Sequence, residues 1–147
     1  KGPNIMKGYW NRPEATANAI DEMGWFHSGD VGYIDEEGYL YICDRLKDMV
    51  ITGGENVYPA EVESVLFEHP AITEVAVIGL PDEKWGEAVT AVAAITGGSD
   101  LTLEGLRDFA VAKLARYKLP SRLHIVEALP RNPAGKVLKF ELRETLA

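Results

Sequence analysis

Residues 44–59 constrain the fold of this chain more than any other stretch. They combine a charged elbow, a short apolar run and the pair Gly53-Gly54, directly before a helix start at Pro59. Gly53 and Gly54 permit positive φ angles, or let a ligand approach the main chain closely. Pro59 suits the first helical position, because its missing N–H would have no partner there. A hairpin turn that leads into a helix explains the glycine pair alone; the polar clusters elsewhere in the chain favour a functional loop.

Composition limits the class of protein. The 147 residues allow one or two domains with a hydrophobic core, and 46% hydrophobic with 26% charged residues is typical of soluble globular proteins. The formal net charge of −8 argues against a nucleic-acid partner, although one local basic spot is present at Lys113, Arg116, Lys118 and Arg122. The single cysteine, Cys43, excludes an intramolecular disulfide and fits a reducing compartment.

No apolar run is long enough to span a membrane, and no secretory signal is present. We therefore expect a cytoplasmic protein without a transmembrane segment, with peripheral membrane contact left open. Residues 1–6 have neither a start methionine nor the composition of a tail, so we expect the chain to be a fragment of a larger protein.

The pattern of apolar residues predicts an α+β fold in two parts. Residues 1–45 contain a short helix at 13–22 and a hairpin formed by strands at 31–35 and 39–44, and they form a first, β-rich part that ends at the charged elbow. Residues 46–147 form a second, α+β part, with helices packed on a three-stranded sheet. Its helices are expected at 59–69, 103–115 and 140–146, and its strands at 49–52, 74–80, 88–96 and 123–126.

Two polar clusters of the first 50 residues are suited to nucleotide binding. Asp30 follows a glycine at the end of an aromatic run, where a carboxylate can accept hydrogen bonds from two sugar hydroxyls. A turn aspartate that bonds its own backbone is the alternative. Arg45 offers a planar guanidinium group whose N–H donors can bind phosphate or ribose oxygens. Lys47 lies at a point where a change of its φ and ψ angles would rotate the whole of the chain that follows. A solvated run of charges is the alternative at this elbow.

Two further clusters lie in loops of the second part. Pro130 and Pro133 stiffen a loop in which Gly135 allows a sharp turn, so that Lys136 is presented at a defined place. Its ammonium group could neutralise charge on a transferring acyl-phosphate centre, or it could be an ordinary exposed lysine. Trp85 is a large aromatic residue in a polar loop, where it caps the edge of a core or stacks on a ligand.

Taken together, these motifs resemble the C-terminal part of the adenylate-forming superfamily, which comprises acyl-CoA synthetases, firefly-type luciferases and peptide-synthetase adenylation domains. The resemblance runs from about residue 2 to residue 146 and covers the last third of a typical member. Ser28-Gly29-Asp30, residues 44–48 and residues 53–59 look most like medium- and long-chain fatty acid–CoA and aryl-CoA ligases.

The resemblance implies that residues 1–45 are the end of a large N-terminal domain with a small β-rich subdomain and that residues 46–147 are a small mobile C-terminal domain. It implies an ATP-dependent acid–CoA ligase that forms an acyl-adenylate with Mg²⁺ and then an acyl-CoA after rotation of the small domain. It implies that Asp30 and Arg45 bind the nucleotide, that Lys47 is the hinge and that Lys136 acts in adenylation only. It also implies roles in the thioester step for Gly53, Gly54, Trp85, Tyr117 and Lys118, with Tyr117 and Lys118 contacting the CoA nucleotide.

The phosphate loop, the acyl pocket and the metal ligands of the family are absent from these residues, so we expect them upstream and expect this fragment alone to be inactive. An adenylate-forming enzyme with another acceptor, either luciferase-like or a carrier-protein ligase, is one alternative. A non-catalytic nucleotide- or CoA-binding module is another. Presence of Asp30, Arg45 and Lys136 together argues against the module.

Overall fold

The structure is a computed structural model that describes all of residues 1–147. It separates into two compact units, Lys1–Ile42 and Cys43–Ala147.

The first unit is small and has no buried core. Helix α1 (Pro13–Ala19) starts with a proline at its first position, and strands β1 (Asp30–Ile34) and β2 (Leu40–Arg45) form a two-stranded sheet whose second strand continues into the next unit. The carboxylate of Asp35 closes the β1–β2 turn by accepting hydrogen bonds from the backbone N–H groups of Glu37 (3.0 Å) and Tyr39 (2.8 Å). No residue before Val50 is buried.

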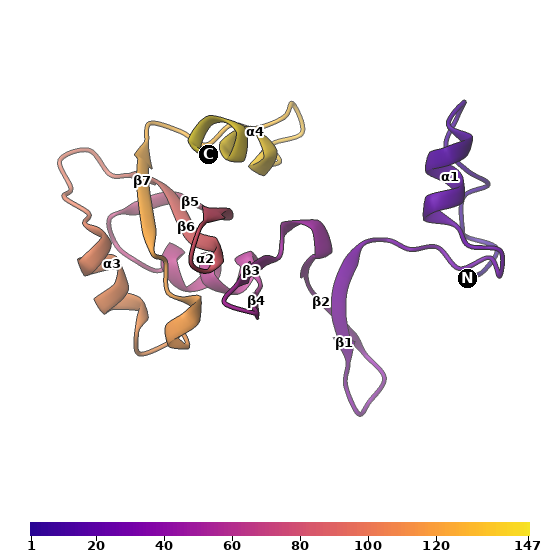
Figure 1. The fold of residues 1–147 in the computed structure, drawn as a ribbon, viewed down its shortest axis with the longest axis horizontal. Coiled ribbons are helices and arrows are strands. Elements are labelled where there is room, and N and C mark those ends of the chain that lie inside the picture. Colours follow the sequence, from indigo (N-terminus) through magenta and orange to yellow (C-terminus); the bar gives the residue numbers. More distant parts are fainter. The chain divides into compact units, whose positions relative to one another are not determined.

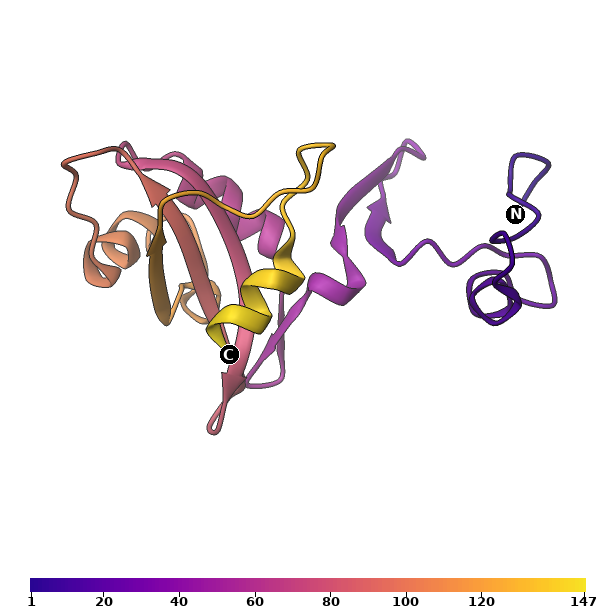
Figure 2. The ribbon, with the colours of Figure 1, turned by 90° about the horizontal axis from the view of Figure 1, so that it is seen from above.

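The second unit is built on one five-stranded sheet (Figure 1). A turn of 3-10 helix, η1 (Leu46–Asp48), precedes the hairpin of β3 (Val50–Thr52) and β4 (Glu55–Val57). The long strands β5 (Ile72–Asp82) and β6 (Gly86–Ile95) pair antiparallel, and β7 (Arg122–Val126) pairs parallel with β6. The strand order is β4-β3-β6-β5, with β7 beside β6. Figure 2 shows the β3–β4 and β5–β6 turns side by side at one end of the sheet, where Thr52 pairs with Gly86.

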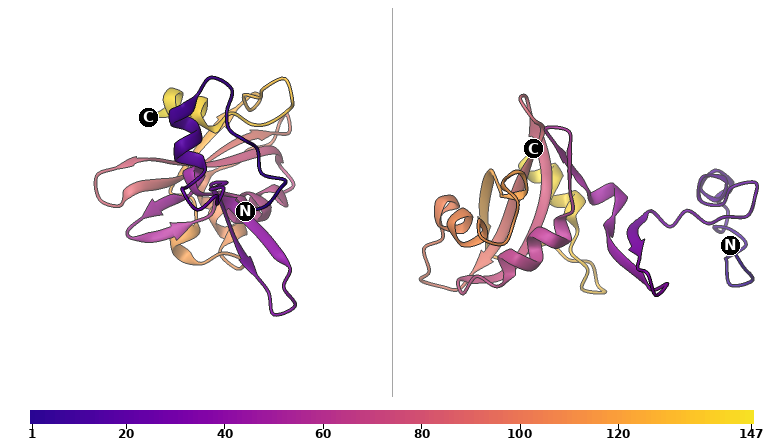
Figure 3. Two further views of the ribbon diagram at one scale, coloured as in Figure 1. Left: turned by 90° about the vertical axis from the view of Figure 1, so that its right-hand side faces the viewer. Right: turned by 90° about the horizontal axis from the view of Figure 1, so that it is seen from below.

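Helices cover both faces of this sheet (Figure 3). Helices α2 (Pro59–Phe67) and α3 (Leu103–Ala110) pack on one face against residues such as Val77 and Ala91. Helix α4 (Lys139–Leu146) buries Leu142 on the opposite face against residues such as Ile78 and Val92. Because both faces are covered, β5 and β6 are apolar along most of their length instead of alternating.

The predicted α+β class is confirmed, but the sheet has five strands where a three-stranded sheet was predicted; the strand predicted at 49–52 joins it as β3, and β4 was not predicted. Strand β4 was missed because three residues, Glu55–Val57, carry little apolar pattern; pairing with β3 across the glycine turn makes them a strand. Helix α3 ends at Ala110, five residues before the predicted end, and a 3-10 turn, η2 (Arg116–Lys118), follows it. Leu114 reaches the core from the intervening turn, which accounts for the longer apolar stripe in the sequence.

Candidate functional site

Lys136 is presented by a hydrogen-bonded loop between β7 and α4. The side-chain amide oxygen of Asn132 accepts hydrogen bonds from the backbone N–H groups of Ala134 (3.1 Å) and Lys136 (2.9 Å). Gly135 has a φ of +82°, which only glycine adopts without strain, and its N–H donates to the carbonyl of Asn132. Arg131 ties the loop to the sheet through the carboxylate of Glu74 (2.6 Å). The loop is therefore rigid, and it ends with an exposed ammonium group.

The charged elbow is anchored to two helices. The carboxylate of Asp44 accepts hydrogen bonds from its neighbour's N–H and from the N–H of Ala60 (2.8 Å), in the first turn of α2, where no intrahelical partner exists. Asp48 forms an ion pair with Arg143 of α4 at 3.1 Å. Lys47, between these two anchors, is exposed to solvent.

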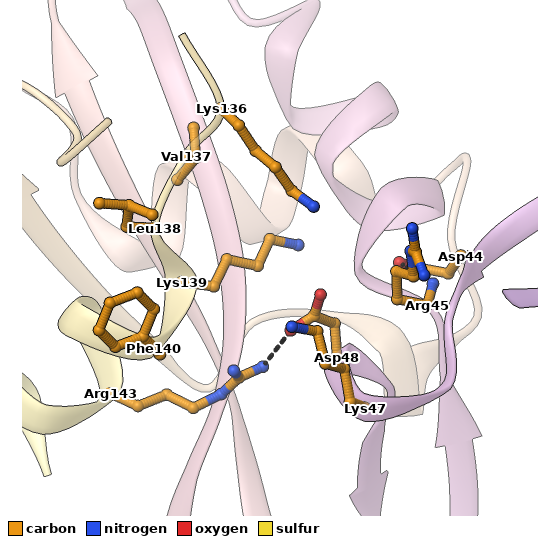
Figure 4. A pocket seen from close by; sticks show the side chains of 10 residues that line it. All are labelled: Asp44, Arg45, Lys47, Asp48, Lys136, Val137, Leu138, Lys139, Phe140 and Arg143. Atoms are coloured by element: carbon orange, nitrogen blue, oxygen red, sulfur yellow. Dashed lines mark hydrogen bonds and ion pairs between the residues drawn. The ribbon is translucent and has the colours of Figure 1, made fainter. Parts of the chain in front are cut away.

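The elbow and the lysine loop face each other across a cavity of about 420 Å³, which we name the elbow cavity (Figure 4). Its lining residues are Asp44, Arg45, Lys47, Asp48, Lys136, Val137, Leu138, Lys139, Phe140 and Arg143. Figure 4 shows the side chains of Lys136 and Lys139 extending into the cavity toward the elbow. Five of the lining residues are cationic and two are anionic, so the cavity favours an anionic ligand.

Helix α4 positions this cavity through residues that the sequence reasoning missed. Lys139 and Arg143 are four residues apart and therefore lie on one face of the helix. Lys139 forms an ion pair with Glu63 of α2 at 2.7 Å, and Arg143 holds Asp48. The carboxylate of Glu63 also accepts a hydrogen bond from the N–H of Val77 at the edge of the sheet. The i, i+4 spacing of two cations on the terminal helix was the signal that could have identified them.

The glycine turn and Trp85 contact each other at the end of the sheet. The N–H of Gly53 donates a hydrogen bond to the carbonyl of Trp85 at 2.8 Å. The φ of Gly53 is +59°, and a Cβ at this position would lie 3.0 Å from Cε3 of the Trp85 ring. Gly54 has a φ of +85° and open space around it. Both positions need glycine for backbone conformation, and Gly53 also needs it for the approach of the indole.

Asp82 shapes the loop that carries Trp85. Its carboxylate accepts hydrogen bonds from the backbone N–H groups of Trp85 and Lys84, both at 3.0 Å, and it pairs with Arg122 at 3.1 Å. The Trp85 N–H, then the Lys84 N–H and the Arg122 charge, lower the pKa of Asp82 below its ordinary value. The ammonium group of Lys84 lies 4.6 Å from the centroid of the indole ring of Trp85 and forms a cation–π contact with it.

A second cavity, of about 320 Å³, opens beside Trp85, and we name it the tryptophan cavity. It is lined by Thr52, Gly53, Glu55, Trp85, Val89, Arg107, Arg116, Tyr117, Leu119 and Ser121. It combines two aromatic rings and two guanidinium groups with one carboxylate. This composition suits a ligand with both a planar or apolar part and an anionic part.

The cations of the basic spot differ in their partners. The ammonium group of Lys118 contacts both carboxylate oxygens of Glu61 at 2.7 Å, and this hydrogen bond raises the pKa of Lys118 above its ordinary value. Lys113 forms an ion pair with Glu68, and Arg122 forms one with Asp82. Arg116 forms no ion pair and is exposed.

The structure brings the predicted site residues together in two groups. Arg45, Lys47 and Lys136 line the elbow cavity. Gly53, Trp85 and Tyr117 line the tryptophan cavity; Gly54 and Lys118 are adjacent in sequence to lining residues but do not line it. Asp30 lies in the first unit as the first residue of β1, where its N–H donates to the hydroxyl of Ser28. Arg107 and Glu55 were not predicted as site residues.

Two further properties concern metals and membranes. Among residues 1–147, no group of three or more histidine, cysteine, aspartate and glutamate side chains is placed to hold a metal ion. None of the helices has the length and apolar character that crossing a membrane requires.

Comparison with known proteins identifies relatives over nearly the whole chain. A long-chain fatty acid–CoA ligase of Mycobacterium tuberculosis, FadD13, is 56% identical over 98% of this chain and 28% of its own length. The crystal structure of ATP-bound MatB from Rhodopseudomonas palustris is 46% identical, covers 99% of this chain and 29% of its own, and superposes with a TM-score of 0.90. The o-succinylbenzoate CoA synthetase MenE of Bacillus subtilis, in complex with an acyl-adenylate intermediate, is 44% identical over 97% of this chain and 29% of its own, with a TM-score of 0.89.

The chain thus spans less than a third of the length of each of these three relatives. The predicted resemblance to adenylate-forming acid–CoA ligases is confirmed by these similarities. The profile of the AMP-binding enzyme C-terminal domain matches residues 61–136, which extend from α2 to the presented lysine. This match and the similarity to these relatives lead to one conclusion: the chain belongs to the family of AMP-binding enzyme C-terminal domains.

Proposed function

We propose that this chain is the C-terminal part of an ATP-dependent acid–CoA ligase and that it serves the two steps of the reaction with two different surfaces. The observation that carries the proposal is that two sets of predicted residues line separate cavities: Arg45, Lys47 and Lys136 line one, Gly53, Trp85 and Tyr117 line the other, and the two cavities share no lining residue. One cavity presents a lysine on a rigid loop, and the other combines aromatic and cationic groups beside a glycine turn. The two steps call for two such surfaces, because the attacking group is an anionic carboxylate in the first step and a thiol in the second.

In the first step a carboxylate attacks the α-phosphorus of ATP, which forms the acyl-adenylate and releases pyrophosphate. Both reactants are anionic, so their approach is opposed by charge repulsion. The ammonium group of Lys136 would lie between them and stabilise the charge that develops in the transition state. Asp30 would hold the ribose hydroxyls, and Arg45 would lie near the ribose and phosphate.

In the second step a thiol attacks the acyl carbon, the thioester forms and AMP leaves with its phosphate. A thiol needs an open approach to the acyl carbon, which the main chain at Gly53 and Gly54 would border after a rotation about Lys47. Trp85, Tyr117 and Lys118 would lie along the path of the thiol substrate. Both cavities hold more cationic than anionic side chains, so we assign the ligands of Mg²⁺ to residues outside this chain.

We further propose that the acid is a fatty acid and that the enzyme works in the cytoplasm. A relative named as a long-chain fatty acid–CoA ligase supports the first part. A relative named for o-succinylbenzoate makes an aromatic acid the main competitor.

The direct test uses the full-length protein that contains this chain. Pyrophosphate release and acyl-CoA formation are measured with fatty, aromatic and short dicarboxylic acids, with and without CoA. A thioester that depends on ATP, acid and CoA supports the ligase and identifies the acid. Pyrophosphate release without thioester would instead indicate another acceptor, and no reaction with any acid would indicate a binding module.

Lys136→Ala separates the two steps. We expect acid-dependent pyrophosphate release to fall by about 100- to 1,000-fold, the usual effect of losing one charge-stabilising group in a transition state. Thioester formation from supplied acyl-adenylate should stay within about threefold of the unmodified enzyme, because the lysine serves only the first step. Lys113→Ala, which removes an exposed cation outside both cavities, is the matched control and should change neither rate. An equal loss in both steps for Lys136→Ala would contradict the division of labour.

A further inference from the structure

The pairing between β3 and β6, which carry the glycine turn and the residues after Trp85, stops after one position. The N–H of Gly53 donates to the carbonyl of Trp85 at 2.8 Å. In an antiparallel ladder every second pair of residues exchanges backbone hydrogen bonds. The next such pair would be Ile51 and Glu87, but β3 and β6 are paired at one position only. The N–H of Ile51 donates instead to the side-chain carboxylate of Glu87, at 2.7 Å.

A glycine in β5 leaves the space that this carboxylate occupies. Gly79 is buried, and a Cβ added to it would lie 2.5 Å from Oε1 and 2.8 Å from Cδ of Glu87. Gly79 is not among the glycines with a positive φ, so its backbone conformation does not require glycine. The approach of the Glu87 carboxylate does require it, because a side chain at position 79 would push the carboxylate away from Ile51.

We infer that Glu87 is a positioning residue for the thioester step, because its carboxylate fixes the glycine turn on the sheet. A charged acceptor forms a stronger hydrogen bond than a backbone carbonyl does, so this bond firmly joins the base of the turn to β6. Ile51 is two residues from Gly53, which lines the tryptophan cavity and would border the path of the thiol. Glu87 does not line that cavity, so it acts through the turn and not by touching the substrate.

This inference rests on the proposed function, and it is tested in the full-length enzyme with Glu87→Ala. We expect the kcat of thioester formation from supplied acyl-adenylate to fall by about 10- to 100-fold, because a shift of about 1 Å in a positioned group costs about 100-fold in rate. The KM for CoA and the rate of acid-dependent pyrophosphate release should each stay within about threefold, because Glu87 contacts neither substrate.

Two further variants separate the hydrogen bond from the charge. Glu87→Gln keeps an acceptor oxygen at the same reach and should recover most of the lost thioester rate. Glu83→Ala is the matched control, because it removes an exposed carboxylate from the turn between β5 and β6. It should change neither step.

Gly79→Ala tests the same contact from the neighbouring strand while Glu87 is kept. The added methyl group should displace the carboxylate and slow the thioester step by a similar factor. In the Glu87→Ala background the same substitution should add less than about twofold, because no carboxylate is left to displace. Deuterium uptake by peptides that span β3, measured by mass spectrometry, should rise in Gly79→Ala and Glu87→Ala but not in Glu83→Ala.

Three results would overturn the inference. An unchanged thioester rate in Glu87→Ala would show that the turn is positioned without this bond. Equal losses in both steps would show that Glu87 only stabilises the fold. Additive effects of Gly79→Ala and Glu87→Ala would show that the methyl group does not act through the carboxylate. If the unmodified enzyme forms no thioester with CoA, the proposed function fails instead, a result that differs from all three because the deuterium uptake of β3 still responds to Glu87→Ala.

Discussion

At the scale of single residues, Gly53 and Gly54 both have a positive φ, but only Gly53 also lies against a neighbouring side chain. Alanine at Gly54 would meet no atom within 4 Å and would suffer only from the positive φ, at a cost of about 1–2 kcal/mol. Alanine at Gly53 adds a Cβ that lies 3.0 Å from the indole of Trp85. The ring would have to move, at a further cost of about 1–3 kcal/mol, the usual range for overpacking.

We therefore predict that Gly53→Ala lowers the free energy of unfolding more than Gly54→Ala does. Urea titrations followed by far-UV circular dichroism measure this difference, and near-UV circular dichroism reports whether the environment of the indole changes. In the full-length enzyme, Gly53→Ala should slow thioester formation while acid-dependent pyrophosphate release is kept, because only the tryptophan cavity is disturbed. Equal destabilisation by the two alanines, with an unchanged near-UV spectrum, would show that the contact with Trp85 has no consequence.

At the scale of elements, α4 and η1 are joined by the ion pair between Asp48 and Arg143. Asp48 has 14% of its side chain exposed and Arg143 has 30%, so water screens this pair less than it screens the Lys113–Glu68 pair, whose side chains are 43% and 57% exposed. Asp48→Asn should lower the free energy of unfolding by about 1.5–3 kcal/mol, the range for hydrogen bonds to charged groups. Lys113→Met should change it by about 0–1 kcal/mol, as is usual for surface pairs.

A double-mutant cycle on Asp48→Asn and Arg143→Met tests whether the energy belongs to the pair. The pair also links η1, which contains the proposed hinge Lys47, to the helix that follows Lys136, so the same variants should slow the proposed adenylation step more than thioester formation. If the two substitutions have additive effects on stability, the ion pair carries no coupling energy, and another contact must hold α4 to the elbow.

At the scale of the whole molecule, the core lies entirely in the second unit. All buried hydrophobic residues fall between Val50 and Leu142, and the first unit exposes large apolar side chains such as Trp10, 89% exposed. A segment that buries so little apolar surface cannot offset the entropy lost on folding. We predict that residues 43–147 fold alone and that residues 1–42 do not, as the dispersion of amide signals in two-dimensional NMR spectra of the two fragments would show. A well-dispersed spectrum for residues 1–42 would contradict this prediction.

Much of the fold could be predicted from the sequence because local chemistry specifies it. Pro13 and Pro59 mark helix starts, Gly53 and Gly54 mark a turn, and the apolar runs of β5 and β6 mark strands buried on both faces. The presented position of Lys136 followed from Pro130, Pro133 and Gly135, although the Asn132 side chain that closes the loop was not anticipated. The family resemblance rested on these same local motifs.

The sequence by itself therefore determined most element types, the turns, the family and a set of candidate site residues, because each depends on neighbours a few positions away. Only the tertiary structure decided which charges are compensated. Lys118 and Glu61 are 57 residues apart, and Arg143 and Asp48 are 95 apart, so no local pattern shows that they pair. The same holds for β4, which is a strand because β3 lies beside it. Charge pairing and sheet membership are properties of distant segments that folding brings together.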